Sequence, residues 1–99
     1  IDEHLVPHPS RTQLIKVKGD SMIDGGIHDG DIVVVERRAS AQPGDIVVAI
    51  VDNEFTVKRL ARGKGRLILR AENKAYPAIR PEADAEIFGV VVGLFRKYR

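Results

Sequence analysis

The sequence predicts a mainly β fold, with a curled or barrel-like antiparallel sheet of about six or seven short strands. Runs rich in Val and Ile recur along the chain, and turn residues such as Gly, Asp and Pro separate them. No segment shows a convincing helical period. The length of 99 residues suits one domain with one compact core.

The beginning of the chain divides into an arm and a first strand. Residues 1–12 are predicted to form an extended N-terminal arm, because Pro7 and Pro9 push their neighbours toward extended backbone. Residues 13–99 are predicted to form the β domain. Its first strand is expected at 13–18, where apolar side chains alternate with lysines as in a half-buried strand.

Two later segments carry nearly the same residues. The string GDIVVV at 30–35 is followed 14 residues later by GDIVVA at 44–49. Each is predicted to be a strand entered through a Gly-Asp turn, and the continuous β-branched runs predict burial on both faces. The Gly- and Asp-rich stretch at 19–30 is expected to form turns, with room for a short helical turn at 21–23.

A hairpin is expected around residues 51–54, because a short Asp-Asn link joins two β-rich runs there. In the strand expected at 54–60, alternation places side chains on two faces: Phe55, Val57 and Arg59 on one, and Thr56, Lys58 and Leu60 on the other. The remaining elements are expected to be a turn at 62–65, a strand at 66–70, an irregular segment at 71–86, a strand at 88–95 and a basic tail at 96–99.

The composition excludes several classes of protein. There is no cysteine, so disulfides and thiolate metal sites are excluded, and the chain fits a reducing cytoplasm. No apolar run approaches the length of a membrane span, and no signal-peptide pattern precedes the domain. We therefore expect a cytoplasmic location and no membrane contact.

The chain opens on Ile rather than Met, which suggests a processed product or a truncated chain.

The net charge of +2 is unevenly distributed. Residues 1–60 hold seven basic and ten acidic side chains, whereas residues 61–99 hold nine basic and four acidic ones. A basic half is compatible with a nucleic-acid surface, but few aromatic residues are present to stack on bases. A solvated basic face is therefore the favoured interpretation.

The histidines raise the possibility of a serine protease triad, and the aspartates that of a calcium site. Neither set of residues has the spacing that such a site needs. A Ser-His-carboxylate triad needs a placed histidine, but the histidines lie in the arm or in a turn: His4, His8 and His28. Several aspartates cluster, but their spacing does not match a calcium-binding loop: Asp20, Asp24, Asp29 and Asp31. We interpret the histidines as surface residues and the aspartates as turn formers. No metal and no cofactor are predicted.

Ser21 and Lys58 form a third candidate. Ser21 follows a strand on a glycine-rich turn, which lifts its hydroxyl out of the sheet and leaves backbone N–H groups to face an oxyanion. A serine hydroxyl needs a base to remove its proton, and a lysine can serve only when it is neutral. Desolvation lowers a lysine pKa, and Lys58 lies mid-strand in an apolar hairpin. By composition alone, a solvent-facing strand lysine is the more common interpretation.

The segments around these two residues resemble the LexA/UmuD family of Ser-Lys proteases. GDSMIDGGI at 19–27 is similar to the nucleophile segment, and DGD at 29–31 to the block that follows it. GDIVVA at 44–49 and EFTVKRL at 54–60 resemble the hairpin that carries the family's lysine, and FGVV at 88–91 resembles the closing strand. The interval of 37 residues from Ser21 to Lys58 also matches.

The resemblance implies the family's C-terminal protease fold, with Ser21 as nucleophile and Lys58 as general base. It also implies a homodimer and self-cleavage at a small-residue–Gly bond, triggered by a RecA filament. The UmuD branch is the more similar, which implies an SOS-response accessory subunit of an error-prone UmuC-like translesion polymerase. The alternative is the C-terminal domain of a LexA-like repressor. Neither case implies sequence-specific DNA binding by this domain. No Ala-Gly or Cys-Gly pair precedes Ser21, so we expect a trimmed chain without the usual cleavage site.

Overall fold

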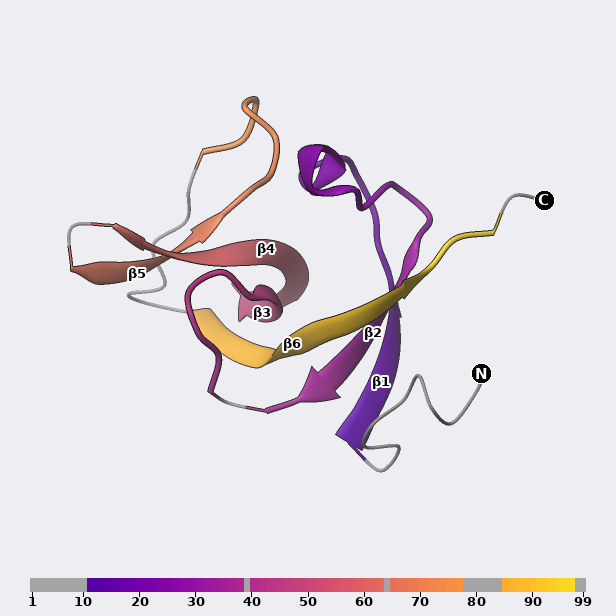
Figure 1. The fold of residues 1–99 in the computed structure, drawn as a ribbon, viewed down its shortest axis with the longest axis horizontal. Coiled ribbons are helices and arrows are strands. Elements are labelled where there is room, and N and C mark those ends of the chain that lie inside the picture. Colours follow the sequence, from indigo (N-terminus) through magenta and orange to yellow (C-terminus); the bar gives the residue numbers. More distant parts are fainter. Residues whose placement is uncertain (1–10, 39, 64, 78–84, 98–99) are drawn as a thin grey trace.

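The computed structural model describes residues 11–38, 40–63, 65–77 and 85–97. Within them, six strands form one antiparallel sheet in the order β1-β2-β6-β3-β4-β5 (Figure 1). The strands are β1 (Thr12–Lys16), β2 (Ile32–Arg37), β3 (Ile46–Val51), β4 (Glu54–Gly63), β5 (Arg66–Arg70) and β6 (Ala85–Phe95). The predicted mainly β fold is confirmed. The first ten residues of the predicted arm lie outside the described residues.

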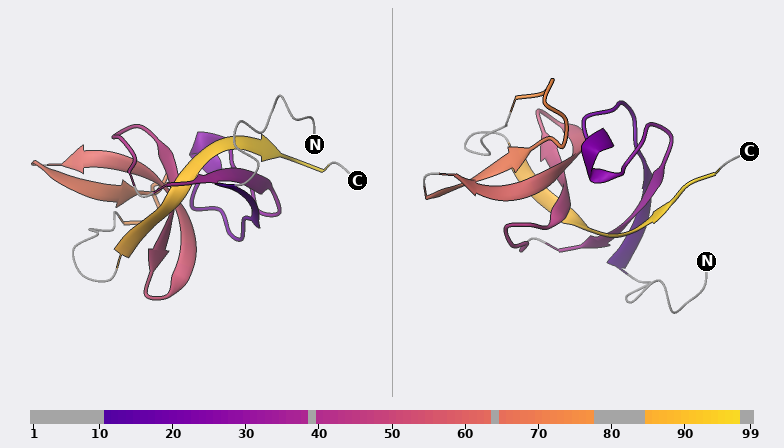
Figure 2. Two further views of the ribbon diagram at one scale, coloured as in Figure 1. Left: turned by 90° about the horizontal axis from the view of Figure 1, so that it is seen from below. Right: turned by 45° about the horizontal axis from the view of Figure 1, so that its top comes forward.

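The sheet curls because β6, at its centre, carries two irregularities. Val34 pairs with Gly93 but Val35 pairs with Val91, so Val92 is an extra residue between the two pairs. In the same way, Phe88 is extra opposite the step from Val48 to Ala49 on β3. Bulges of this kind bend a strand and increase its twist, and the three views show the bent β6 (Figures 1 and 2).

Gly89 allows β6 to approach β2 closely. A Cβ atom at Gly89 would lie only 2.5 Å from the carbonyl oxygen of Glu36 and 2.7 Å from a methyl group of Val35. Any larger residue would therefore push the two strands apart next to the Phe88 bulge.

Apolar clusters cover the two faces of the sheet, and β3 contributes to both. Val48 belongs to the first cluster, whereas Val47 and Ala49 belong to the second. The prediction that the two repeated strands are buried on both faces is thus confirmed. The first cluster holds Val17, Met22, Ile27, Val33, Val35, Val48 and Val57. The second holds Val47, Ala49, Leu60, Leu69 and Val90.

The predicted hairpin joins β3 to β4. Asp52 and Asn53 have φ values of 50° and 66°, and Val51 pairs with Glu54 across the turn. Positive φ at both central residues matches the strand twist, and Asp and Asn tolerate this conformation better than most residues. The register that follows places Lys58 opposite Val47.

The bounds of several strands differ from those expected, and three of them bear on the site. The first strand covers Thr12–Lys16 rather than 13–18, because Val17 bonds to the turn at Gly30 and Asp31. The strand expected at 54–60 runs on to Gly63, since it continues to pair with β5. The last strand begins at Ala85 rather than at residue 88. Among the described residues, no helix has the length and apolar character needed to cross a membrane.

Candidate active site

Ser21 lies on a tight turn between β1 and β2. The turn begins at Gly19, whose φ of 87° favours glycine, and the N–H of Ile23 donates to the carbonyl of Asp20. The next residue, Met22, is almost fully buried and anchors the turn in the first apolar cluster. The expected helical turn is present as a turn at 21–22 and a short 3-10 helix, η3 (Ile23–Gly25). This arrangement leaves Ser21 half-buried beside a cleft.

Lys58 comes to Ser21 from the middle of β4. Its side chain is only 7% exposed. The Lys58 Nζ atom lies 3.0 Å from Ser21 Oγ, 2.8 Å from Thr56 Oγ1 and 3.2 Å from the Val57 carbonyl oxygen. The two side chains paired by the sequence argument are therefore within hydrogen-bond distance, although they are 37 residues apart.

The environment of Lys58 favours its neutral form. Burial lowers the pKa of the Lys58 ammonium below its ordinary value, because water no longer solvates the charge. A neutral amine has two N–H donors and one lone pair. Thr56 Oγ1 and the Val57 carbonyl can accept the two donors, which leaves the lone pair for the hydroxyl proton of Ser21. This geometry suits proton transfer from serine to lysine.

A cavity of about 340 Å³ opens in front of Ser21. It lies between β1, which is one edge of the sheet, and the start of β4. Its lining combines apolar and basic side chains with the two hydroxyls: Ile15, Lys16, Val17, Lys18, Ser21, Phe55, Thr56 and Val57. An edge strand beside a cleft offers backbone groups to an extended peptide.

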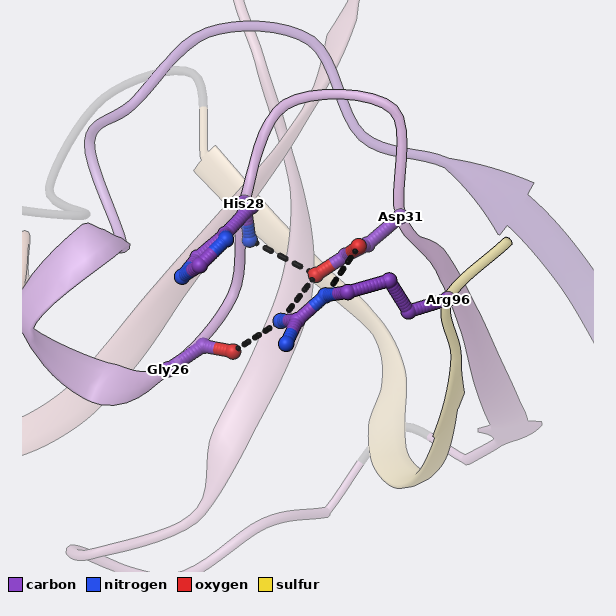
Figure 3. A network of polar contacts seen from close by, with 4 residues as sticks. All are labelled: Gly26, His28, Asp31 and Arg96. Atoms are coloured by element: carbon purple, nitrogen blue, oxygen red, sulfur yellow. Dashed lines mark hydrogen bonds and ion pairs between the residues drawn. The ribbon is translucent and has the colours of Figure 1, made fainter. Parts of the chain in front are cut away.

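An ion pair between buried Asp31 and half-buried Arg96 fixes the far end of the segment that carries Ser21. Asp31 is 2% exposed, and Arg96 donates to both of its carboxylate oxygens, at 2.9 and 2.8 Å (Figure 3). Arg96 also donates to the Gly26 carbonyl at 2.7 Å, and the N–H of His28 donates to Asp31 Oδ2 at 2.7 Å. The hydrogen bonds from Arg96 lower the pKa of Asp31 to about 2. Sequence reasoning placed Arg96 only in a basic tail and missed this contact.

The interpretation of the aspartates as turn formers holds only in part. Asp31 accepts the N–H of His28, three residues earlier, but it also pairs with Arg96. Asp29 Oδ1 accepts the N–H of Gly19, ten residues away, at 2.7 Å. His28 is exposed, whereas His4 and His8 lie outside the described residues. No group of three or more His, Cys, Asp or Glu side chains within the described residues is arranged to hold a metal ion.

Residues 72–76 also contact the Ser21 turn, and the sequence argument treated them only as irregular. The sole signal in the sequence was a dense group of polar residues between β5 and Pro77. Such a pattern indicates a loop but names no partner.

The chain is similar to known proteins over most of its length. The Peptidase S24-like family matches residues 1–92. The chain is 45% identical over 93 residues to a LexA repressor from Clostridium perfringens, with 94% of the chain and 45% of the relative covered. It is 49% identical over 94 residues to Protein MucA of Salmonella typhimurium, with 92% and 64% covered. The chain thus spans about half the length of the LexA relatives. With a family match that extends over most of its length, the chain belongs to the Peptidase S24-like family.

Proposed function

We propose that this chain is a serine peptidase domain in which Ser21 is the nucleophile and Lys58 the general base. The observation that carries the proposal is the 3.0 Å approach of Lys58 Nζ to Ser21 Oγ at a lysine that is 7% exposed. Thr12 is the first residue of β1, so in this proposal the peptidase domain includes it and the arm ends before it.

The chemistry follows from the protonation state of Lys58. Neutral Lys58 takes the hydroxyl proton while Ser21 Oγ attacks the peptide carbonyl carbon, and the carbonyl electrons move to oxygen. Collapse of this intermediate breaks the C–N bond, and the Lys58 ammonium returns its proton to the leaving amine. Water then attacks the acyl-enzyme with Lys58 again as base, which releases the acid and restores Ser21.

The substrate is an extended peptide. The cleft beside β1 presents apolar walls from Ile15 and Phe55, next to the nucleophile. A peptide strand along the edge of β1 would bring its scissile bond to Ser21 with main-chain hydrogen bonds on one side. Because the chain holds no Ala-Gly or Cys-Gly pair, the activity is tested with a substrate supplied in trans.

We infer a UmuD-like role as the biological setting: a cytoplasmic SOS-response protein whose homodimer is an accessory subunit of a UmuC-like translesion polymerase, with cleavage triggered by a RecA filament. The match to Protein MucA supports this branch. The match to LexA repressors, including one from Caldicellulosiruptor saccharolyticus at 50% identity over 84 residues, supports a second candidate. In that case the chain is the dimerisation and self-cleavage domain of a repressor.

The peptidase proposal is tested by mixing the chain with a full-length LexA repressor whose own nucleophilic serine is replaced by alanine. Cleavage should rise with pH between 6 and 10 as Lys58 loses its proton. We expect Ser21→Ala and Lys58→Ala to lower the rate by at least about 10³-fold. Ser40→Ala and Lys74→Ala, at exposed positions, are the matched controls. Persistent cleavage by Lys58→Ala, or a flat pH profile, would contradict the assignment of the base.

The two biological settings are separated by the residues that precede Ile1 in the full-length protein. A short arm with a Cys-Gly or Ala-Gly pair supports the UmuD-like role. A winged-helix DNA-binding domain supports the repressor.

A further inference from the structure

The loop that follows β5 packs against the turn that carries Ser21. The two segments lie side by side at one end of the molecule, the loop in orange and the turn in purple (Figure 2). Asn73 Nδ2 donates to the carbonyl oxygen of Asp20 at 2.9 Å, and the hydroxyl of Tyr76 donates to Asp20 Oδ1 at 2.6 Å. Residues 72–76, here called the 72–76 loop, thus hold the residue directly before the nucleophile.

The 72–76 loop also holds the turn after the nucleophile. The N–H of Asp24 donates to the carbonyl oxygen of Glu72 at 2.8 Å. Gly25 packs directly on Glu72, since a Cβ atom there would lie 3.1 Å from Glu72 Cγ. The loop therefore bonds to the turn on both sides of Ser21.

The same loop is joined to β4 beside Lys58. Arg59 Nε donates to Glu72 Oε1 at 2.7 Å, and Arg59 Nη1 donates to the Gly44 carbonyl at 2.7 Å. The Arg59 and Glu72 side chains are 27% and 21% exposed, so the contribution of this pair to stability is modest. The pair matters more for geometry than for stability. Through it, the 72–76 loop contacts Arg59, which follows Lys58, as well as Asp20, which precedes Ser21.

Asn73 makes one hydrogen bond within the loop and one to the Ser21 turn. Its Oδ1 atom accepts the N–H of Ala75 at 3.0 Å, which closes the loop on itself, while Nδ2 is directed to Asp20. Tyr76 keeps its proton for this contact, because the hydrogen bond to the Asp20 carboxylate raises the pKa of the Tyr76 hydroxyl.

We propose that Asn73 and Tyr76 are positioning residues that hold Asp20, and through it direct the Ser21 hydroxyl toward Lys58. The proposal rests on the proposed peptidase function and adds a set of residues outside the cleft to it. A displacement of about 1 Å at a reacting group costs on the order of 100-fold in rate. Since water can replace part of an exposed hydrogen bond, we expect smaller losses here.

The test measures how fast Ser21 reacts with a fluorescent fluorophosphonate. In this reaction a P–O bond forms at Ser21 Oγ, fluoride leaves, and Lys58 takes the hydroxyl proton. Asn73→Asp keeps the Oδ1 acceptor but loses the donor and places a carboxylate against the Asp20 carbonyl. Tyr76→Phe removes only the hydroxyl. Lys74→Ala, an exposed position in the same loop, is the matched control.

Asn73→Asp should lower the maximal labelling rate about tenfold and Tyr76→Phe about threefold, whereas Lys74→Ala should match the wild type. The probe concentration at half-maximal rate should stay unchanged in both loop variants. The midpoint of the pH–rate profile should stay unchanged in Tyr76→Phe, because that variant adds no charge and leaves Lys58 buried. A change that loosened the packing around Lys58 would instead hydrate its amine and move the midpoint to higher pH. Wild-type labelling rates in both loop variants, or a shifted midpoint in Tyr76→Phe, overturn the proposal.

A second measurement does not depend on catalysis. In amide hydrogen exchange, the N–H of Asp24 should exchange faster in Asn73→Asp, while the core N–H of Val48 keeps its protection. Unchanged exchange at Asp24 overturns the positioning role. If the wild type is not labelled, or if Lys58→Ala is labelled equally fast, the proposed peptidase function fails, and the exchange result still decides whether the loop holds the turn.

Discussion

Two buried charged side chains, Asp31 and Lys58, differ in whether a counter-ion faces them. Asp31 is 2% exposed and is paired with the Arg96 guanidinium, whereas Lys58 is 7% exposed and contacts two hydroxyls and one carbonyl, all of them uncharged. The pKa values of both groups are lowered, with opposite consequences. Asp31 remains ionised and serves the structure, whereas Lys58 loses its charge more readily and becomes able to accept a proton.

The comparison explains how one small fold combines a stable turn with a reactive group. A buried ion pair needs a partner of opposite charge and good geometry, and Asp31 has both together with the N–H of His28. A general base needs the reverse, a buried amine without a nearby carboxylate. Substitutions can remove the counter-ion of Asp31, give Lys58 a counter-ion, or remove the Lys58 amine.

The largest effect on stability is expected from Arg96→Met, which leaves Asp31 buried without its counter-ion. We expect the free energy of unfolding at pH 7 to fall by about 3 kcal/mol. Urea denaturation measures this loss, and Lys97→Met, at the exposed neighbouring position, is the control. An equal loss in both variants would contradict a specific role for the pair.

The stability lost in Arg96→Met should depend on pH. In the wild type, the pKa of Asp31 is lowered to about 2, so the stability from the pair is present at neutral pH and is lost as the pH falls from about 4 toward 2. In Arg96→Met, the strongest contact that lowers the pKa of Asp31 is gone, so the buried carboxylate takes up a proton at a higher pH than in the wild type. The difference in stability between the two proteins should therefore shrink as the pH is lowered toward 2.

The sequence predicted local features better than distant contacts. The apolar runs predicted the strands, and the Asp-Asn link predicted the hairpin, because turn and strand preferences act over a few neighbouring residues. Ser21 and Lys58 were identified only through several ordered family blocks. Arg96, the partner of Asp31, lies 65 residues away, and the two partners of Asp20 lie 53 and 56 residues away. Such contacts depend on sheet register and on the two bulges in β6, which no local pattern specifies.

An effect on activity is expected when Lys58 is given a counter-ion. Thr56 Oγ1 lies 2.8 Å from Lys58 Nζ, so Thr56→Asp places a carboxylate beside the amine. The carboxylate favours the ammonium form, raises the pKa of Lys58 and moves the pH–rate profile to higher pH. At a fixed pH below the midpoint, each pKa unit lowers the rate about tenfold. Thr56→Asn is the uncharged control for the labelling assay, and an equal profile shift in that variant would rule out an electrostatic cause.

The smallest effect is a gain in stability when the buried amine is removed. Lys58→Met keeps most of the side-chain volume and removes the desolvated charge, so we expect the free energy of unfolding at pH 7 to rise by about 1 kcal/mol while activity is lost. The pKa of Lys58 is lower in the folded than in the unfolded chain, so the unfolded chain binds more protons between the two values. Wild-type stability therefore rises with pH through that window, and the advantage of Lys58→Met should narrow toward pH 10.

Urea denaturation at several pH values measures this change, with Lys74→Met as the exposed control. A variant that is less stable than the wild type at pH 7, or an advantage that does not vary with pH, would show that burial of this amine does not oppose folding.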